Sequence, residues 1–422
     1  MIDKVRTYIK REIGLNPESE VLVALSGGAD STALLLIMKE LGYKLRALHC
    51  NFGLRGEESY RDQTFVEKLC KQEGILLYVS HFDTEEVAKE RGISIEMAAR
   101  ELRYKWFREK LKALKASCVA VAHHRDDQAE TLLLNLLRGT GLRGLAGMQP
   151  KHDGIIRPLL CLNREEILQY LKSRGQSYVT DSTNLERTYL RNRIRLDLMP
   201  LLQSINPSAV EHLCLASENV QESLPYYIKG IEAAFKELGI TEETFPLKAL
   251  TSGTLLHEWL AGKGFNSAQE EEMLNTNTNG VGKMWLSNSH KVLRDRQALL
   301  LAPCFMPLSK PEIKQEIVSC IGETGENIAY FDADLITKPI EVRPVREGDA
   351  FVPFGMTGRK LVSDYLTDRK LNRFEKAETF VAVCGEDIIW LIGHRSDNRY
   401  RVTDNTRRIL KLHVDKSPTS RG

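Results

Sequence analysis

The sequence predicts an α/β N-terminal domain with a doubly wound parallel sheet, followed by a small, mostly helical domain and an α+β C-terminal domain. From residue 20 to about 160, short apolar runs alternate with segments of helical periodicity, which is the pattern of repeated β-α units. The runs are almost wholly apolar, as expected for strands covered by helices on both faces of a sheet. The four predicted strands are residues 21–25, 44–50, 75–81 and 118–124.

The rest of the chain divides by changes in pattern. We expect the first domain to span residues 1–215 and to end in a basic helix that breaks near Pro200 and Pro207. Residues 216–311 have helical periodicity and finish in a hairpin-like stretch at 287–303. Residues 312–422 mix strands with one basic helix, GRKLVSDYLTDRKL. Three domains are therefore predicted.

Composition narrows the class of protein only modestly. The 422 residues carry a formal net charge of +2, so charge alone neither requires nor excludes a nucleic-acid partner. The 8 cysteines include no C-x-x-C pair, which favours free thiols in a reducing compartment. No apolar run reaches membrane-span length, and the N-terminus lacks the apolar core of a signal peptide. We expect a cytoplasmic protein with no membrane partner.

The motif SGGADS follows the first predicted strand and opens a helix. Its glycines allow a tight turn, and free N–H groups at a helix start favour an anion such as phosphate. In nucleotide-hydrolysing proteins, loops of this kind carry a lysine that reaches the terminal phosphates. That lysine is absent here, and the loop contains Asp30. An ordinary strand-to-helix turn is the alternative, because an acidic residue at a helix start is mildly stabilising. The predicted cradle is Ser26, Gly27, Gly28, Ala29, Asp30 and Ser31.

The block HHRDDQAE follows the fourth predicted strand. Asp127, Glu130 and Thr131 share one helix face, and His123 lies at the strand end. One aspartate could simply cap the helix, and a His/Asp zinc site is a second alternative. The density of acids favours a magnesium–phosphate site with an acid or base for proton transfer.

A helix between these motifs carries arginines that could bind phosphate. In SIEMAARELRYKWFREKL, Arg100 and Arg103 fall at helical spacing and could bind phosphate in bidentate fashion. A salt-bridged surface helix is the alternative. Because loops after parallel strands meet at one sheet edge, we expect the three polar motifs that follow the strands, SGGADS, HCNFGLRGEES and HHRDDQAE, to converge.

These residues resemble a known family. SGGADS resembles the pyrophosphate loop (PP-loop) of the N-type ATP pyrophosphatases, which split ATP into AMP and pyrophosphate. HCNFGLRGEES, the EMAAR-x-LRY helix, HHRDDQAETLLLNLLRGTGLRGLAGM and YLRNRIRLDLMPLL together resemble the tRNA(Ile)-lysidine synthetase family, as does the stretch from residue 342 to 408. Phe52 departs from the family pattern, which often has histidine there. The resemblance makes 1–215 the catalytic domain and 312–422 the tRNA-binding domain.

The resemblance implies an AMP-forming ligase. It would join free L-lysine to C2 of the wobble cytidine of tRNA(Ile) with anticodon CAU, through an adenylated base, with ATP and Mg²⁺. Asp30 and Asp127 would hold the metal, Asp127 or Glu130 would deprotonate the lysine amine, and Arg103 and His123 would stabilise phosphate charge. A homodimer is possible. The expected tRNA contacts are Arg187, Arg191, Arg193, Arg195, Arg359, Lys360, Arg369 and Lys370.

Two other functions fit part of the pattern. A tRNA thiolase of the same superfamily would adenylate a base in the same way, but it generally needs active cysteines or an iron–sulfur cluster. A tRNA-binding protein that keeps ATP as a structural ligand would not need the acidic block. The alternative for the basic residues is that they are ordinary solvated surface residues, and we expect this of about half of them.

Overall fold

The computed structural model describes residues 1–54, 56–180, 190–276, 280–305 and 309–415. The chain forms two compact units, residues 1–228 and 229–422. The predicted boundary at 215/216 falls within a long helix, α11 (Ala209–Leu238), which runs from the first unit into the second.

A six-stranded sheet organises the first unit, in the order β3-β2-β1-β4-β6-β5. Neighbouring strands are parallel except β5, which pairs antiparallel with β6. All four predicted strands are present, as β1 to β4. The strands are β1 (Glu20–Ala24), β2 (Lys44–Asn51), β3 (Leu76–His81), β4 (Cys118–Ala120), β5 (Lys151–His152) and β6 (Ile155–Ile156).

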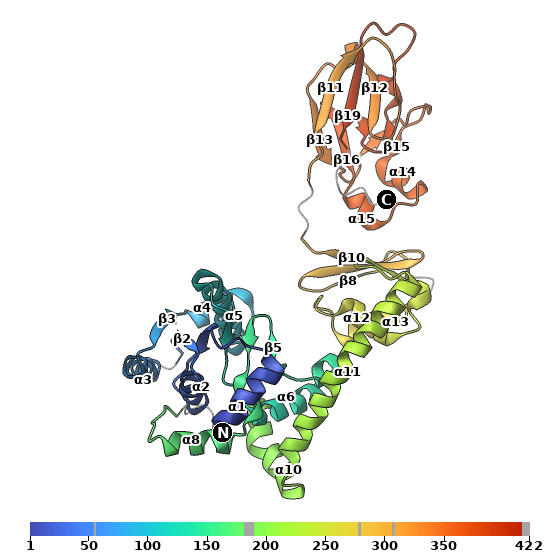
Figure 1. Ribbon diagram of the computed structural model, residues 1–422. Helices are drawn as coiled ribbons and strands as arrows, with labels where there is room; N and C mark the ends of the chain where they lie inside the picture. Colours follow the sequence, from blue (N-terminus) through green and yellow to red (C-terminus); the bar gives the residue numbers. More distant parts are fainter. Residues whose placement is uncertain (55, 181–189, 277–279, 306–308, 416–422) are drawn as a thin grey trace. The chain divides into compact units, whose positions relative to one another are not determined.

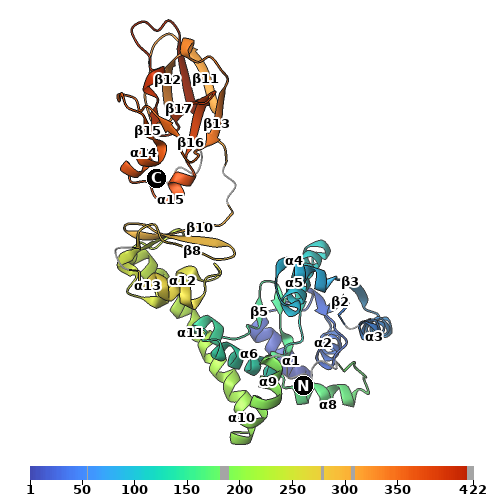
Figure 2. The same cartoon turned by 180° about the vertical axis from the view of Figure 1, so that it is seen from behind.

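Helices cover both faces of this sheet, which confirms the doubly wound prediction (Figures 1 and 2). One apolar core joins β1 to α1, α2, α3 and α8, and a second joins β1, β2 and β4 to α5 on the other face. Strands buried from both sides can therefore be almost wholly apolar. These helices are α1 (Ile2–Tyr8), α2 (Ala29–Glu40), α3 (Glu57–Glu73), α4 (Thr84–Arg91), α5 (Ile95–Leu114), α6 (Arg125–Leu137), α7 (Leu142–Leu145) and α8 (Arg164–Ser173).

The basic helix at the end of this unit does not break at Pro200. It runs through α9 (Leu190–Arg193), a π-helical turn (Ile194–Leu198) and α10 (Met199–Ile205). Pro200 lies in the first turn of α10, where its missing N–H costs little. The helix ends before Pro207, as expected, and it packs through Ile194 and Met199 against α6 and α11.

The second unit consists of small antiparallel sheets and short helices. Helices α12 (Gly253–Leu260) and α13 (Ser267–Leu274) pack on a sheet of order β7-β10-β9-β8, whose β9–β10 hairpin was predicted. Three further sheets follow, together with α14 (Val362–Asp368) and α15 (Arg373–Ala377). The strands of the second unit are β7 (Thr244–Pro246), β8 (Met284–Leu286), β9 (His290–Arg294), β10 (Ala298–Pro303), β11 (Ile313–Val318), β12 (Ile328–Asp332), β13 (Ile340–Pro344), β14 (Ala350–Phe351), β15 (Lys360–Leu361), β16 (Phe380–Cys384), β17 (Asp387–Leu391), β18 (Arg395–Ser396) and β19 (Ile409–Val414).

Across the described ranges, the helices are all too short or too polar to span a bilayer.

Candidate active site

The loop between β1 and α2 is held in one conformation by its own hydrogen bonds. The Ser31 hydroxyl accepts from the Ser26 N–H (3.2 Å) and donates to the Gly28 carbonyl (3.1 Å). Gly27 has a φ of +92°, and a Cβ there would lie 3.3 Å from the side chains of Phe65 and Val66, so the position requires glycine. No side chain caps α2, which leaves the N–H groups of its first turn available to an anion.

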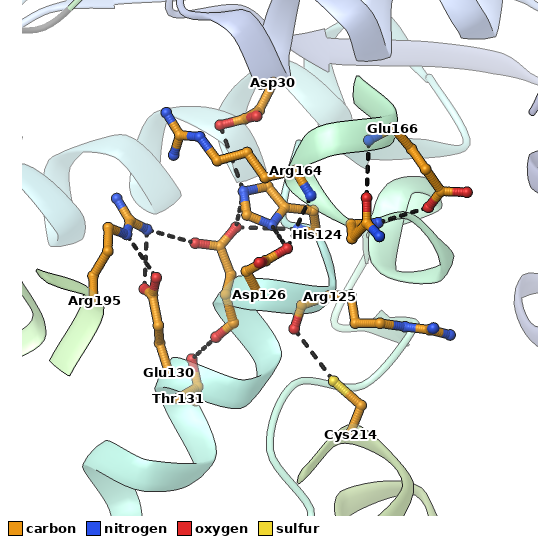
Figure 3. A network of polar contacts seen from close by, with 12 residues as sticks. Asp30, His124, Arg125, Asp126, Glu130, Thr131, Arg164, Glu166, Arg195 and Cys214 are labelled. Atoms are coloured by element: carbon orange, nitrogen blue, oxygen red, sulfur yellow. Dashed lines mark hydrogen bonds and ion pairs between the residues drawn. The ribbon is translucent and has the colours of Figure 1, made fainter. Parts of the chain in front are cut away.

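His124 is a buried residue at the centre of a group of three carboxylates near the start of α6 (Figure 3). Its side chain is 1% exposed, and its Nε2 lies 3.7 Å from Asp30 Oδ2 and 3.4 Å from Asp127 Oδ2. Its Nδ1 lies 3.4 Å from Asp126 Oδ2. Burial works to lower the pKa of His124, but Asp126, Asp30 and Asp127 outweigh it and raise the pKa to about 10. His124 is therefore a cation beside the loop, a role that sequence analysis did not assign to it.

Two arginines bind the two predicted catalytic acids of α6. Arg191 donates to Glu130 Oε2 and to Asp127 Oδ1, at 3.1 Å in each case. Arg195 donates from Nε to Glu130 Oε1 (2.6 Å), and from Nη2 to Glu130 Oε2 (2.9 Å) and Asp127 Oδ1 (3.2 Å). Burial would raise the pKa of Asp127, but the charges of His124 and Arg191 are among those that hold it below its usual value. The acids thus form an ion-pair network with α9 and the π-helical turn.

A cavity of about 320 Å³, here called cavity A, lies where the three predicted motifs converge. The convergence expected from the sequence is therefore present. The Arg103 guanidinium lies 5.3 Å from the ring centroid of Phe52, which itself stacks on Phe82. Besides loop and strand backbone, cavity A is lined by Asp30, Leu48, Cys50, Phe52, Arg103, Tyr104, Phe107, His123 and Asp127.

His123 is neutral at physiological pH. Burial lowers its pKa to about 4, and Arg157 donates from Nε to His123 Nδ1 at 3.3 Å. Since Nδ1 accepts this hydrogen bond, the ring proton lies on Nε2. His123 can therefore serve a phosphate as a hydrogen-bond donor and not, as a charged histidine would, through an ion pair.

The neutral state of His123 predicts a pH dependence of stability. Its pKa is 6.5 in a model peptide and about 4 in the fold, so the unfolded chain binds the proton more tightly between these values. The contribution is fully present above pH 6.5 and is lost as pH falls through 4. In the wild-type protein, His123 should raise the free energy of unfolding by about 3 kcal/mol as pH increases across this window. The His123→Gln variant should lack this increase. Urea denaturation at pH 4.5, 5.5 and 6.5 tests this, with exposed His152→Gln as the control. Identical pH profiles for wild type and His123→Gln would contradict it.

A second cavity of about 260 Å³, cavity B, lies beside the same loop. Ser26, Gly28, Asp30 and Arg195 line it together with Arg164, the first residue of α8. The Arg164 backbone N–H donates to Asp126 Oδ2 at 2.9 Å, which ties α8 to the carboxylate group. Within the described ranges, the Arg164 guanidinium makes no ion pair. The sequence does not indicate a role for Arg164, because the residue is separated from both motifs and has no motif of its own.

The predicted tRNA contacts fall into two groups. Arg191 and Arg195 face the acids of α6, whereas Arg193 is exposed. In the second unit, Lys360 pairs with Asp368 and the Arg369 guanidinium lies over the Tyr365 ring. Exposed side chains also include Arg359 and Lys370, and Arg187 lies outside the described residues.

Comparisons with known proteins decide the family. The sequence profile of the PP-loop domain family matches residues 1–202, and that of the TilS substrate binding domain matches residues 244–304. The tRNA(Ile)-lysidine synthase of Bacteroides thetaiotaomicron is 45% identical, with 96% of this chain and 98% of that protein covered. That of Parabacteroides distasonis is 42% identical, with 97% and 99% covered. The chain belongs to the tRNA(Ile)-lysidine synthase family.

Membership of the tRNA(Ile)-lysidine synthase family accounts for the PP-loop as an ATP-binding element. Family membership also disfavours the tRNA thiolase alternative. The state of the cysteines supports the same conclusion. Cys50 lines cavity A, but burial raises its pKa to about 12, so it keeps its proton at neutral pH and is a poor nucleophile. All eight cysteines are free, and five of them are buried.

Of the two aspartates predicted to bind magnesium, Asp30 is available as a ligand, whereas Asp127 is already hydrogen-bonded. Asp30 Oδ1 is buried with no hydrogen-bond partner, as expected of an oxygen that could bind a cation. Both oxygens of Asp127 already accept hydrogen bonds, from Arg191, Arg195 and the His124 N–H. Over the described ranges, no three His, Cys, Asp or Glu side chains are grouped to hold a metal, so the zinc alternative lacks a ligand set. Magnesium, by contrast, usually takes most of its ligands from phosphate and water.

Proposed function

We propose that the chain is an AMP-forming ligase that joins free L-lysine to C2 of the wobble cytidine of tRNA(Ile) with anticodon CAU. The observation that carries the proposal is full-length similarity to tRNA(Ile)-lysidine synthases, combined with a phosphate loop and two acids, Asp30 and Asp127, that line one cavity. Such a reaction places the protein in the cytoplasm with its tRNA. A homodimer stays a prediction.

The first half-reaction is adenylation of the base. ATP would bind with its phosphates on Ser26–Ser31, so that the C2 carbonyl oxygen of cytidine attacks the α-phosphorus and pyrophosphate leaves. Arg103 and the Nε2–H of His123 would stabilise the charge on the α-phosphate, and the His124 cation adds to the field at the loop. Bound Mg²⁺ would neutralise phosphate charge, held by Asp30 and, after its arginine contacts rearrange, by Asp127.

The second half-reaction needs a neutral amine. The lysine side chain has a pKa near 10.4, so it must lose a proton before it attacks C2 and displaces AMP. Asp127, whose pKa is held low, suits binding of the ammonium group better than acceptance of its proton. We assign proton acceptance to Glu130, which lines neither cavity A nor cavity B, so that the proton would reach it through Asp127, with which it shares Arg191 and Arg195. Arg191 and Arg195 orient both carboxylates, and the exposed Arg193, Arg359, Arg369 and Lys370 are proposed to contact tRNA phosphates together with Lys360.

One assay tests the function. The protein is incubated with ATP and an in vitro transcript of tRNA(Ile) with anticodon CAU, with and without free lysine, and pyrophosphate and modified nucleosides are measured. We expect lysidine only with lysine, and no product with a transcript in which the wobble cytidine is replaced by uridine. Sulfur incorporation, or pyrophosphate release with no change in the tRNA, would overturn the proposal.

A further inference from the structure

Helices α4 and α5 enclose a groove of about 560 Å³ that the proposed mechanism does not use. We call it the α4–α5 groove and define it by Arg91, Arg100, Glu101, Tyr104, Lys105 and Arg108. Arg100, Tyr104 and Arg108 are spaced by four residues along α5, so one face of that helix forms the wall. The groove is thus a regular feature of the helix pair.

The charge of the groove is strongly positive. Its four cations face a single carboxylate, Glu101, and that carboxylate is paired with Arg91 at 2.8 Å. Lys105 and Arg108 are exposed, and within the described ranges neither forms an ion pair. The protein as a whole has a formal net charge of only +2, so this local excess stands out from the average surface. A polyanion is the ligand that such a surface favours.

The groove adjoins cavity A at Tyr104. Tyr104 lines both, and the Arg100 guanidinium lies 5.0 Å from the centroid of its ring. Arg100 also lies near enough to His123 for its charge to contribute to the low pKa of that residue. A chain that places one unit in cavity A would therefore have its neighbouring units close to the groove.

Among polyanions, an RNA strand fits both the positive charge of the groove and its position beside cavity A. An enzyme that acts on a base takes it out of the stack, and the adjoining phosphates must then lie beside the pocket. Single-stranded nucleic acid is held by grooves that combine positive charge with aromatic side chains on which bases stack. In the α4–α5 groove, Tyr104 is the aromatic side chain, and the half-exposed Met97 adds apolar surface beside it.

We propose that the α4–α5 groove binds the anticodon-loop backbone next to the base that enters cavity A, with Lys105 and Arg108 as phosphate contacts. The proposal rests on the proposed function, since it requires an RNA substrate. It adds a surface that is separate from the basic residues predicted at α9 and in the second unit.

The test compares two double variants of the full-length protein. Lys105→Gln/Arg108→Gln removes two charges from the groove, and Lys89→Gln/Lys112→Gln removes two from the same helices outside its lining. For the groove variant we expect about a tenfold or greater rise in KM for tRNA, with KM for ATP unchanged. The slope of log Kd for tRNA against log salt should fall by about 0.7 for each lost contact. The control should match wild type, and Lys105→Arg/Arg108→Lys should restore binding.

Three outcomes would overturn the proposal. The first is a groove variant with wild-type KM for tRNA and wild-type salt slope. The second is a raised KM for ATP or lysine alone, which would assign the groove to a small substrate. The third is an equal rise in KM for tRNA in the control variant, which would attribute the effect to the overall charge of the protein and not to the groove. Because each outcome is measured with an active wild-type enzyme, it is distinct from failure of the proposed function, in which wild type itself makes no lysidine.

Discussion

Replacing Asp30 with alanine is expected to abolish pyrophosphate release, with a fall in kcat of about 1,000-fold. Asp30 lies in the first turn of α2, lines both cavities, and presents a buried Oδ1 that has no hydrogen-bond partner. Its other oxygen faces the His124 cation. The variant would lose both the proposed magnesium ligand and the balance of charge at the loop. The measurement is tRNA-dependent release of pyrophosphate from ATP, with circular dichroism to show that the fold is kept.

Asp126→Asn is the matched control for this prediction. Asp126 also contacts His124, at 3.4 Å, but it lines neither cavity. We expect it to lose less than about tenfold in kcat, because an asparagine oxygen can still accept from the Arg164 N–H. Near-normal turnover of Asp30→Ala, or an equal loss in both variants, would refute the assignment of Asp30 to phosphate and metal.

Replacing Glu130 with alanine is expected to abolish lysine transfer and to destabilise the first unit by about 3 kcal/mol. Glu130 is 2% exposed and accepts three hydrogen bonds from Arg191 and Arg195. Among the residues that the structure describes, removing Glu130 leaves Asp127 as the remaining ion-pair partner of two partly buried guanidinium groups. Loss of one partner from a buried ion pair is strongly destabilising, because the other charge stays buried. Urea denaturation gives the stability, and single-turnover AMP formation from adenylated tRNA with lysine gives the chemistry. Asp127→Ala should also abolish AMP formation.

The structural and chemical roles of Glu130 can be separated. Glu130→Gln keeps the volume and one acceptor oxygen, so it should lose less stability than alanine but still fail to take the proton. A double-mutant cycle with Arg195→Ala should show coupling in stability, because the two side chains share a hydrogen-bond pair. Exposed Glu109→Ala should stay within about 0.5 kcal/mol of wild type. Full activity in Glu130→Gln would remove Glu130 as the base, and an undiminished stability in Glu130→Ala would contradict the ion-pair argument.

Much of the first unit could be predicted from local pattern. Apolar strands flanked by amphipathic helices give β1 to β4, and the glycines of SGGADS give the loop because Gly27 must take a positive φ. The convergence of the three motifs at cavity A follows from the parallel order of β2, β1 and β4. Pro200 was predicted wrongly as a helix break, because periodicity does not show that this residue falls in the first turn of α10, where the continuing helix tolerates its missing N–H.

The site itself was predicted only in part. Asp30, His123, Asp127 and Arg103 line cavity A as expected, whereas Glu130 does not appear among its lining residues. Arg191 and Arg195 were placed with tRNA, but they lie 61 to 68 residues from the acids they bind, and no local spacing reports such a contact. Their spacing of four residues was the available hint that both face one partner.

By itself, the sequence determined the α/β architecture, the phosphate loop and the acids that follow the fourth strand, because backbone periodicity and glycine conformation are local properties. Only the tertiary structure decided which charges meet. It made His124 a cation by surrounding it with three carboxylates, and it made His123 neutral by burying it beside Arg157. The tertiary structure also pairs Arg191 and Arg195 with Asp127 and Glu130. The protonation state of a side chain depends on burial and on charges brought together from distant segments, and packing alone determines both.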